Sequence, residues 1–124
     1  MRAKIHRARV TRAELGYVGS VSICPDLLRR SDIRPFEQVH VLDVDNGARI
    51  VTYAMEGQPG EICLNGAAAR LVQVGDLVII VAYASYEPRT PLTWGQKARI
   101  AIAGPSLQIT CAIAVLLLNS TNPF

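Results

Sequence analysis

The chain has 124 residues, 50% of them hydrophobic and 19% charged, which is enough for one folded domain with a single core. This composition argues against a disordered chain, and 13 basic against 10 acidic residues leave a mildly basic net charge of +3. Three widely spaced cysteines without a CxxC pair or a Cys/His cluster predict neither a disulfide framework nor a zinc site.

The N-terminus and the tail bear on where the protein works. Charged residues begin at Arg2 and no apolar stretch follows them, so we expect no secretory signal. The apolar run at 107–118 is shorter than the roughly 20 residues that a membrane-spanning helix needs. With cysteines that we expect to be reduced, these features predict a cytoplasmic protein without a membrane partner.

The first third of the chain predicts two strands and a helix. Residues 3–11 alternate between polar and apolar side chains, as a half-buried strand does, and 18–24 continue in an extended pattern. Residues 25–33 predict a short helix, because Pro25 suits the first turn and Asp26 complements the helix dipole there.

The next segment predicts a β-hairpin. Residues 37–44 and 48–55 carry apolar side chains at alternate positions. Between them, Asp-Asn-Gly at 45–47 favours a type I′ turn, because Asn and Gly tolerate positive φ.

The second half predicts further strands. Residues 62–65 predict a short strand, and 66–72 a short helical turn or a packed loop. Residues 74–86 open with a Gly-Asp turn and continue as an apolar strand of a closed or fully covered sheet. Residues 98–103 are one more strand, and 107–118 have a β-propensity that a buried strand or a subunit contact would use. Many short strands with little helix predict a small β-barrel.

Gly19-Ser20 raises a chemical question. The pair is an ordinary turn dipeptide, yet a serine hydroxyl in a strained turn is able to attack the carbonyl before it when donors surround that oxygen. The resulting ester loses the α-proton of residue 20 and expels the Gly19 carboxylate, leaving dehydroalanine. Its hydrolysis releases ammonia and leaves a pyruvoyl group. Glycine suits the first position because it has no Cβ to block the attack.

Three segments around this pair carry a resemblance: "AKIHRARVTRAELGYVGSVSIC", "VHVLDVDNGARIVTYA" and "LNGAAARLVQVGDLVIIVAY". In this order they resemble the pyruvoyl-dependent aspartate 1-decarboxylase family over roughly residues 3–86. The resemblance implies a mainly β fold, a six-stranded double-psi β-barrel with short helices. It also implies decarboxylation of L-aspartate to β-alanine and CO₂ for pantothenate and coenzyme A biosynthesis.

The resemblance further implies how the chain matures and assembles. The single domain 1–124 would cleave itself after Gly19 into a β chain, 1–19, and an α chain, 20–124. Ser20 would become the pyruvoyl cofactor, which forms a Schiff base with the substrate, and neither PLP nor a metal is expected. The implied partners are L-aspartate and three further copies in a homotetramer with active sites between subunits. A maturation factor is a further candidate partner.

Family roles fall on several further residues. Tyr53 matches the proton donor, and Thr52 matches a residue that binds substrate and hydrogen-bonds the Gly19 carbonyl during processing. Lys4 and Arg49 match the cations that bind the substrate carboxylates, a task for which guanidinium geometry is well suited. Read without the family, Arg49 is a solvated hairpin residue and Tyr53 an aromatic side chain with a satisfied hydroxyl.

A second group of positions lines the implied pocket. Asn65 matches a residue that orients the processing intermediate and the substrate, and Ala67 and Ala68 would present backbone N–H groups. His6 and Tyr17 match lining positions of lesser weight. The alternatives are a tight turn leading into a packed alanine patch, and a structural histidine. Because strand neighbours face opposite sides, Thr52 and Tyr53 need a local twist or the sites of different subunits.

Two departures from the family stand out. Leu42 occupies a position where some relatives carry a tryptophan, and residues 87–124 form an apolar, atypical tail. The tail bears on the end of the fold and on assembly more than on the chemistry.

The sequence leaves two other functions open. The chain could be a non-catalytic small basic β-barrel that binds nucleic acid or a protein partner, or a homologue that does not process itself. A basic N-terminal cluster favours the first of these, and it consists of Arg2, Lys4, Arg7, Arg9 and Arg12. One Trp and two Phe are few for the stacking surface of a single-strand binder, so we expect no nucleic-acid partner.

Overall fold

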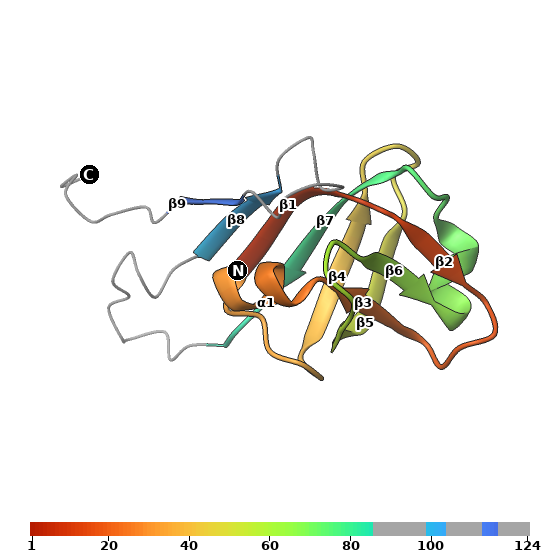
Figure 1. The fold of residues 1–124 in the computed structure, drawn as a ribbon, viewed down its shortest axis with the longest axis horizontal. Helices are drawn as coiled ribbons and strands as arrows, with labels where there is room; N and C mark the ends of the chain where they lie inside the picture. The colour runs from red at the N-terminus through yellow and green to blue at the C-terminus, as the bar shows by residue number, and fades with distance from the viewer. Residues whose placement is uncertain (86–98, 104–112, 117–124) are drawn as a thin grey trace, which may run out of the picture.

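The computed structural model describes residues 1–85, 99–103 and 113–116. Within these ranges the chain is mainly β with two short helices, which confirms the predicted fold class (Figure 1). The strands are β1 (Ala3–Arg9), β2 (Arg12–Glu14), β3 (Ser20–Ile23), β4 (Gln38–Asp43), β5 (Arg49–Glu56), β6 (Ile62–Asn65), β7 (Leu77–Ala82), β8 (Arg99–Ala103) and β9 (Ile113–Leu116). The helices are α1 (Pro25–Ser31) and the 3₁₀ helix η1 (Gly66–Leu71).

The described strands pair in the order β2-β6-β3-β5-β4-β7-β1-β8-β9. Three pairs are parallel, namely β2 with β6, β3 with β5, and β1 with β8, and the other pairs are antiparallel. This mixed sheet folds over a shared core, as a small double-psi barrel does. The result places β3 between β6 and β5, so that the segment following Gly19 has a hydrogen-bonded neighbour on each side.

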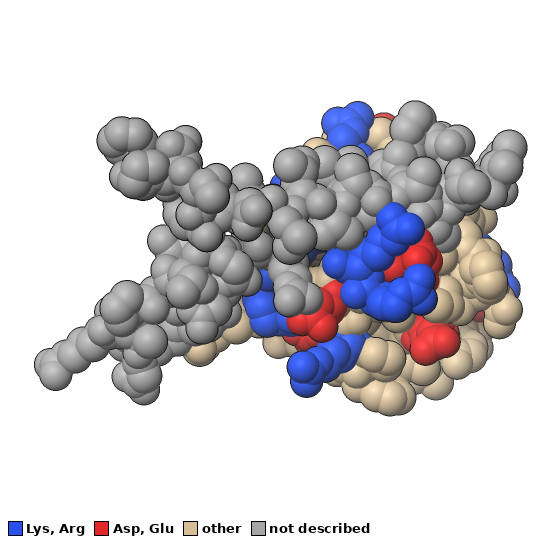
Figure 2. Space-filling view, turned by 60° about the vertical axis from the view of Figure 1, so that its left-hand side comes forward, with Lys and Arg blue, Asp and Glu red and all other residues tan. Residues whose placement is uncertain are grey.

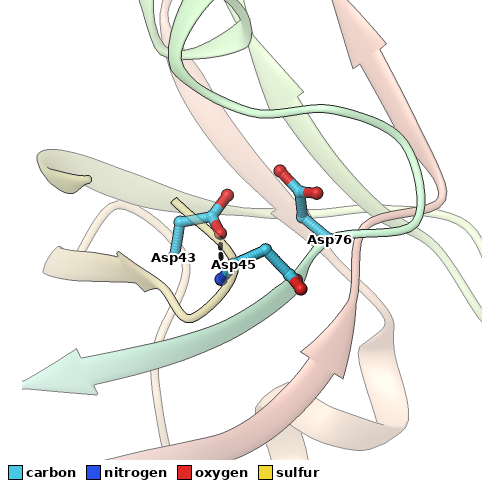
Figure 3. A group of neighbouring side chains, drawn as sticks. All are labelled: Asp43, Asp45 and Asp76. Atoms are coloured by element: carbon cyan, nitrogen blue, oxygen red, sulfur yellow. Dashed lines mark hydrogen bonds between the residues drawn. The ribbon is translucent and has the colours of Figure 1, made fainter. Parts of the chain in front are cut away.

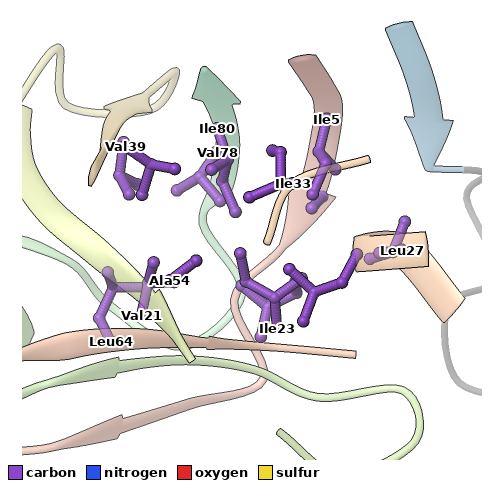
Figure 4. Close-up of a cluster of buried hydrophobic side chains, with 14 of the residues drawn as sticks. Ile5, Val21, Ile23, Leu27, Ile33, Val39, Ala54, Leu64, Val78 and Ile80 are labelled. Carbon is purple, nitrogen blue, oxygen red and sulfur yellow. The ribbon is translucent and has the colours of Figure 1, made fainter. Parts of the chain in front are cut away.

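Alternate residues of the strands supply the core. Val21 and Leu64, from β3 and β6, lie across the core from Val39 and Ile80 of β4 and β7 (Figure 4). All four side chains are fully buried. Because one face of each strand is used up in this way, the opposite face of β3 and β6 remains available for polar groups.

Helix α1 closes one side of the core. It begins at Pro25, as predicted, and ends at Ser31, two residues earlier than expected, where Asp32 takes a left-handed conformation with φ of 59°. Leu27 is fully buried against the strands (Figure 4). Asp26 pairs with Arg29 and Arg30 on the outer side of the helix.

The hairpin between β4 and β5 forms where predicted, but its turn is not type I′. Gly47 has a φ of 76°, whereas Asn46 has no positive φ. The loop is closed by Asp43, whose N–H donates to the Ala48 carbonyl at 2.9 Å and whose carbonyl accepts from Gly47 at 2.9 Å. The Asp43 carboxylate also caps the N–H groups of Asp45 and Asn46, and this cap is what favours the longer loop.

Strand β1 is shorter and less regular than the predicted strand over 3–11. Its pairing with β7 shifts between Ile5 and Ala8, and Arg7 has a φ of 60°, so a bulge interrupts the alternation at His6 and Arg7. The turn predicted at Gly75 and Asp76 is confirmed, but the strand that follows it, β7, ends at Ala82 and not at 86.

The predicted strands of the tail are described only in part. Strand β8 confirms the strand expected over 98–103, and it pairs with β1. Strand β9 lies inside the apolar run 107–118, whose other residues, like most of the tail after 87, fall outside the described ranges. None of the helices in the described part of the chain has the length and apolar character to cross a bilayer.

The buried position of Leu27 leads to a stability prediction. We expect Leu27→Ala to lower the free energy of unfolding by about 2–5 kcal/mol, because it leaves a cavity between α1 and the strands. Leu15→Ala, at a position that is 52% exposed, should change it by less than about 0.5 kcal/mol. Urea denaturation of both variants measures the difference, and equal losses would show that α1 does not pack against the core through Leu27.

Candidate active site

Ser20 lies at the start of β3, with its side chain fully buried. Antiparallel pairing of β3 with β6 sets Ser20 directly opposite Asn65 and Ser22 opposite Cys63. Since Val21 and Leu64 face the core, these four polar side chains share the other face of the two strands. The register therefore gathers a small polar cluster around Ser20.

The Asn65 amide links the members of this cluster. Its Nδ2 donates to Ser20 Oγ at 2.8 Å and to Ser22 Oγ at 3.0 Å, and its Oδ1 accepts from the Cys63 thiol at 3.2 Å. Asn65 is buried, so these bonds replace the water that it loses on folding. Both ends of the amide are thus occupied, which holds its N–H on the Ser20 hydroxyl.

Cys63 fits the role of a donor to this amide. Burial, together with the nearby carboxylate of Glu61, raises the pKa of the Cys63 thiol. The thiol therefore stays protonated at neutral pH and donates a hydrogen bond to Asn65 Oδ1. Cys63 and Ser22 are not among the residues predicted from the sequence, although both lie two residues from a predicted site residue on the same strand face, a spacing that could have identified them.

The backbone around Gly19 is tightly packed against Gly66. Gly66 has a φ of 61°, and a Cβ there would lie 2.8 Å from Gly19 Cα, from Gly19 N and from the Tyr17 carbonyl oxygen. Only glycine leaves room for this approach and accepts this φ without strain. The loop before Ser20 therefore rests directly on the first residue of η1.

The Ser20 hydroxyl has two hydrogen-bond partners among the described residues. It accepts from Asn65 and makes a long contact, 3.5 Å, with the Val18 carbonyl oxygen. Neither partner is a general base. Within one chain, the described residues thus hold and polarise the hydroxyl but do not supply a group that removes its proton.

Tyr53 and Thr52 lie on β5, next to β3. Parallel pairing aligns Val21 with Ala54, so Tyr53 stands beside the position of Ser20 on the same outer face. Thr52 lies between Ile50 and Ala54, both buried, on the core face. The two side chains thus face opposite sides, as expected from alternation.

The two predicted cations lie farther away. Arg49 is exposed at the start of β5, four residues before Tyr53, which is roughly 13 Å along a strand. Lys4 lies on β1, which β7 and β4 separate from β5. In one chain the structure brings Ser20, Asn65 and Tyr53 together, but it does not bring Lys4 to them.

The remaining predicted site residues also differ in their exposure and in how near they lie to Ser20. Tyr17 is exposed in the loop before Gly19, while Ala67 is exposed and Ala68 buried in η1. Asn65 precedes η1 without capping it, because its side chain is turned to the serines. His6 lies on β1, away from Ser20, and its buried Nδ1 has no hydrogen-bond partner in the part of the chain that the structure describes.

The charges of His6 and its neighbours bear on its protonation. Burial, and then the nearby cations Lys4 and Arg7, lower the pKa of His6. His6 is therefore neutral at pH 7, and in this state it adds no positive charge to the face that carries Lys4.

Two of the five cations of the basic N-terminal cluster are paired with carboxylates within the fold. Arg2 pairs with Glu37 at 2.6 Å and with Asp32 at 3.4 Å, and Arg12 pairs with Glu14 at 3.3 Å and with Glu61 at 3.7 Å. Figure 2 shows basic and acidic side chains intermixed on the face in view. These ion pairs engage two of the five cations of the cluster, Arg2 and Arg12, which weakens the case for a nucleic-acid binder.

Comparisons with known proteins agree on one family. The family model described as "Aspartate decarboxylase" matches residues 1–109, beyond the motifs that carry the resemblance. Among curated proteins, the aspartate 1-decarboxylase of Bdellovibrio bacteriovorus is 60% identical over 83 residues, 67% of this chain and 67% of that protein. The enzyme of that name from Moorella thermoacetica is 52% identical over 96 residues, 76% of this chain and 75% of that protein. The one from Campylobacter hominis is 50% identical over 97 residues, 78% of this chain and 85% of that protein.

The close approach at Gly66 can be tested with a matched pair of glycines. We expect Gly66→Ala to lower the free energy of unfolding by about 1–3 kcal/mol more than Gly47→Ala, because its methyl group meets the backbone at Gly19. Gly47 has a similar φ of 76°, but nothing lies within 4 Å of a Cβ there, so its cost is the conformational strain alone, about 1–2 kcal/mol. Chemical denaturation gives both values, and equal costs would contradict the packing of Gly66 on Gly19.

Proposed function

Because the chain belongs to the aspartate decarboxylase family, we propose that it is an aspartate 1-decarboxylase whose catalytic group is a pyruvoyl made from its own Ser20. As a carboxy-lyase it converts L-aspartate to β-alanine and CO₂, which serves pantothenate and coenzyme A biosynthesis. The observation that carries the proposal is the buried Ser20 hydroxyl, held by Asn65 directly after Gly19.

The maturation step uses the geometry at this junction. Ser20 Oγ attacks the Gly19 carbonyl carbon. The Gly19 acyl group then moves from the Ser20 nitrogen to Ser20 Oγ, so that an ester replaces the amide at this junction. Loss of the Ser20 α-proton expels the Gly19 carboxylate, and water then releases ammonia from the dehydroalanine. Asn65 favours the attack by fixing the hydroxyl, because its amide is itself held from the other side by Cys63.

The polar surroundings of Ser20 suit the chemistry of the catalytic group. When present, the pyruvoyl supplies a ketone for the substrate amine and accepts the electron pair left by CO₂. Ser20 is buried in the uncut chain and lies beside polar rather than charged groups, so cleavage after Gly19 must open this position before water and the substrate amine reach it. Tyr53 lies on the same face as Ser20 and would donate the proton that replaces the carboxylate.

The substrate carries two carboxylates, which need cations. Arg49 shares the outer face of β5 with Tyr53, and its guanidinium would bind one carboxylate through two parallel hydrogen bonds. Lys4 would supply a second positive charge, and Ala67 and Ala68 would offer backbone N–H groups. Thr52, on the core face, would act on the Gly19 carbonyl only after a local rearrangement of β5 or in the site of another subunit.

The distribution of these residues favours an assembly. Lys4 is separated from β5 by two strands, and the described part of one chain offers Ser20 no base. We therefore propose a homotetramer in which neighbouring subunits complete each site, with a maturation factor as a further partner if processing is slow. A cytoplasmic location is proposed on the reduced state of thiols such as Cys63.

Cleavage can be tested with two neighbouring serines. We expect Ser20→Ala to fold but to stay uncut and inactive, because the nucleophile is gone. Ser22→Ala should still cleave after Gly19, since Asn65 continues to donate to Ser20 Oγ. Denaturing mass spectrometry of aged protein measures cleavage in both variants. Where the chain is cut, the larger piece should begin with a pyruvoyl group, and its mass should be lower than that of a chain beginning with serine by the difference between these two ends.

The outcome of this pair separates the two serines. A cut Ser20→Ala chain would rule out attack by its hydroxyl. If Ser22→Ala stayed intact while the wild type was cut, cleavage would need both hydroxyls and not that of Ser20 alone. Circular dichroism and melting of each variant establish that an uncut chain is folded.

The role of Arg49 predicts a change in substrate affinity. We expect Arg49→Lys to lower kcat/KM for L-aspartate by about 10- to 100-fold, mainly through KM, because lysine cannot bind a carboxylate in the bidentate manner. Arg29→Lys is the control, since Arg29 forms a surface ion pair on α1 and a lysine there keeps the charge. Steady-state release of CO₂ measures both, and an unchanged KM for Arg49→Lys would remove this residue from the substrate site.

A further inference from the structure

Three carboxylates meet at the loop end of the β4–β5 hairpin, on the far side of Arg49 from the Ser20 cluster. Asp43 ends β4, Asp45 lies in the hairpin loop, and Asp76 directly precedes β7 (Figure 3). One oxygen from each of the three lies within 4.8 Å of the others. None of the ion pairs between described residues involves these carboxylates.

Backbone hydrogen bonds fix each carboxylate through one of its oxygens. Asp43 Oδ1 accepts from the N–H groups of Asp45 and Asn46 at 2.8 and 3.2 Å. Asp45 Oδ2 accepts from Leu77 N–H at 2.7 Å, and Asp76 Oδ2 from Gln73 N–H at 2.8 Å. In each case these bonds engage one carboxylate oxygen and not the other. The three carboxylates are therefore held in place, each with a second oxygen that these bonds do not engage.

The second oxygen of Asp43 is the independent observation. Asp43 is 3% exposed, and its buried Oδ2 has no hydrogen-bond partner among the described residues. In Figure 3 the Asp43 carboxylate points toward that of Asp76. A buried carboxylate oxygen that faces a second acid needs a cation or a proton between them.

We propose that Asp43, Asp45 and Asp76 bind one Ca²⁺ ion, with water completing its coordination. Ca²⁺ takes six to eight oxygen ligands at about 2.3–2.6 Å, so that opposite ligands lie up to about 5 Å apart, which accommodates these carboxylates as they stand. Mg²⁺ requires bonds of about 2.0–2.1 Å and would have to draw every pair within about 4.2 Å. The family resemblance implies no metal, and the spacing along the chain does not reveal this cluster, because Asp76 lies far from the other two acids.

The ion would join two loops that the fold already brings together. Val44 N–H donates to the Leu77 carbonyl at 2.8 Å, and Asn46 Nδ2 donates to the Leu71 carbonyl at 2.8 Å. Bound Ca²⁺ would cross-link the loop of the β4–β5 hairpin to the turn before β7. The hairpin loop leads directly into β5, which begins with Arg49. The site therefore stabilises the fold at the start of β5, whether or not the chain is a decarboxylase.

The test uses the full-length protein, freed of metal with EDTA and dialysed at constant ionic strength. Titration with CaCl₂ should show one site in isothermal calorimetry and raise the melting temperature. At 100 times the dissociation constant, binding should increase the folding equilibrium constant about 100-fold. MgCl₂ at the same concentrations should bind more weakly.

Variants of the cluster make the assignment specific. Asp76→Asn and Asp45→Asn should lose the calorimetric site and the calcium-induced rise in melting temperature. In EDTA, Asp76→Asn should melt at or above the wild-type temperature, because it relieves the repulsion with Asp43. Glu56→Gln removes one exposed charge at the other end of β5 and should keep the full response to calcium.

Three results would overturn the proposal. Absence of calcium binding by the wild type would mean that Asp43 and Asp76 share a proton instead. A calcium response that survives in both cluster variants would assign it to other surface carboxylates. Tighter binding of Mg²⁺ than of Ca²⁺ would contradict the choice of ion.

Discussion

The hydrogen bond from Asn65 to the Ser20 hydroxyl is the interaction on which the proposed chemistry depends. It exists because β3 and β6 pair with Ser20 opposite Asn65, and a shift of β3 by one residue would turn Ser20 into the core and away from Asn65. Apolar Val21 and Leu64 oppose that shift, since they fill the core from the same two strands. Ordinary core packing thus determines the position of the Ser20 hydroxyl.

The rest of the site follows from the neighbours of β3. Strand β5 lies on its other edge and carries Tyr53 and Arg49 on one face, while Gly66 presses against the loop that ends at Gly19. Lys4 lies outside this group because β1 belongs to the opposite part of the strand order. One chain therefore provides the proposed cleavage junction and part of the proposed substrate site, which is a physical reason to expect subunits to combine.

Much of the fold is predictable from local patterns, whereas the exceptions arise from contacts that alternation does not report. The helix at Pro25 and the strands around Val39 and Val78 are visible in the sequence, since capping and period-two burial are local. The turn at Asn46 differs from the predicted type because the Asp43 carboxylate caps a longer loop. The bulge at Arg7 has no sequence signal, because it depends on the pairing of β1 with β7 and not on its own residues.

Candidate site residues are predictable where a family motif marks them, but Cys63 and Ser22 are not, because their role is visible only through Asn65. The central claim is that residue 20 becomes a ketone that captures the substrate amine. Incubating aged wild-type protein with L-aspartate and cyanoborohydride, followed by denaturing mass spectrometry, tests this most directly. We expect a stable covalent adduct on the 20–124 piece alone, whereas an uncut chain, or a 20–124 piece of unchanged mass, would contradict the claim.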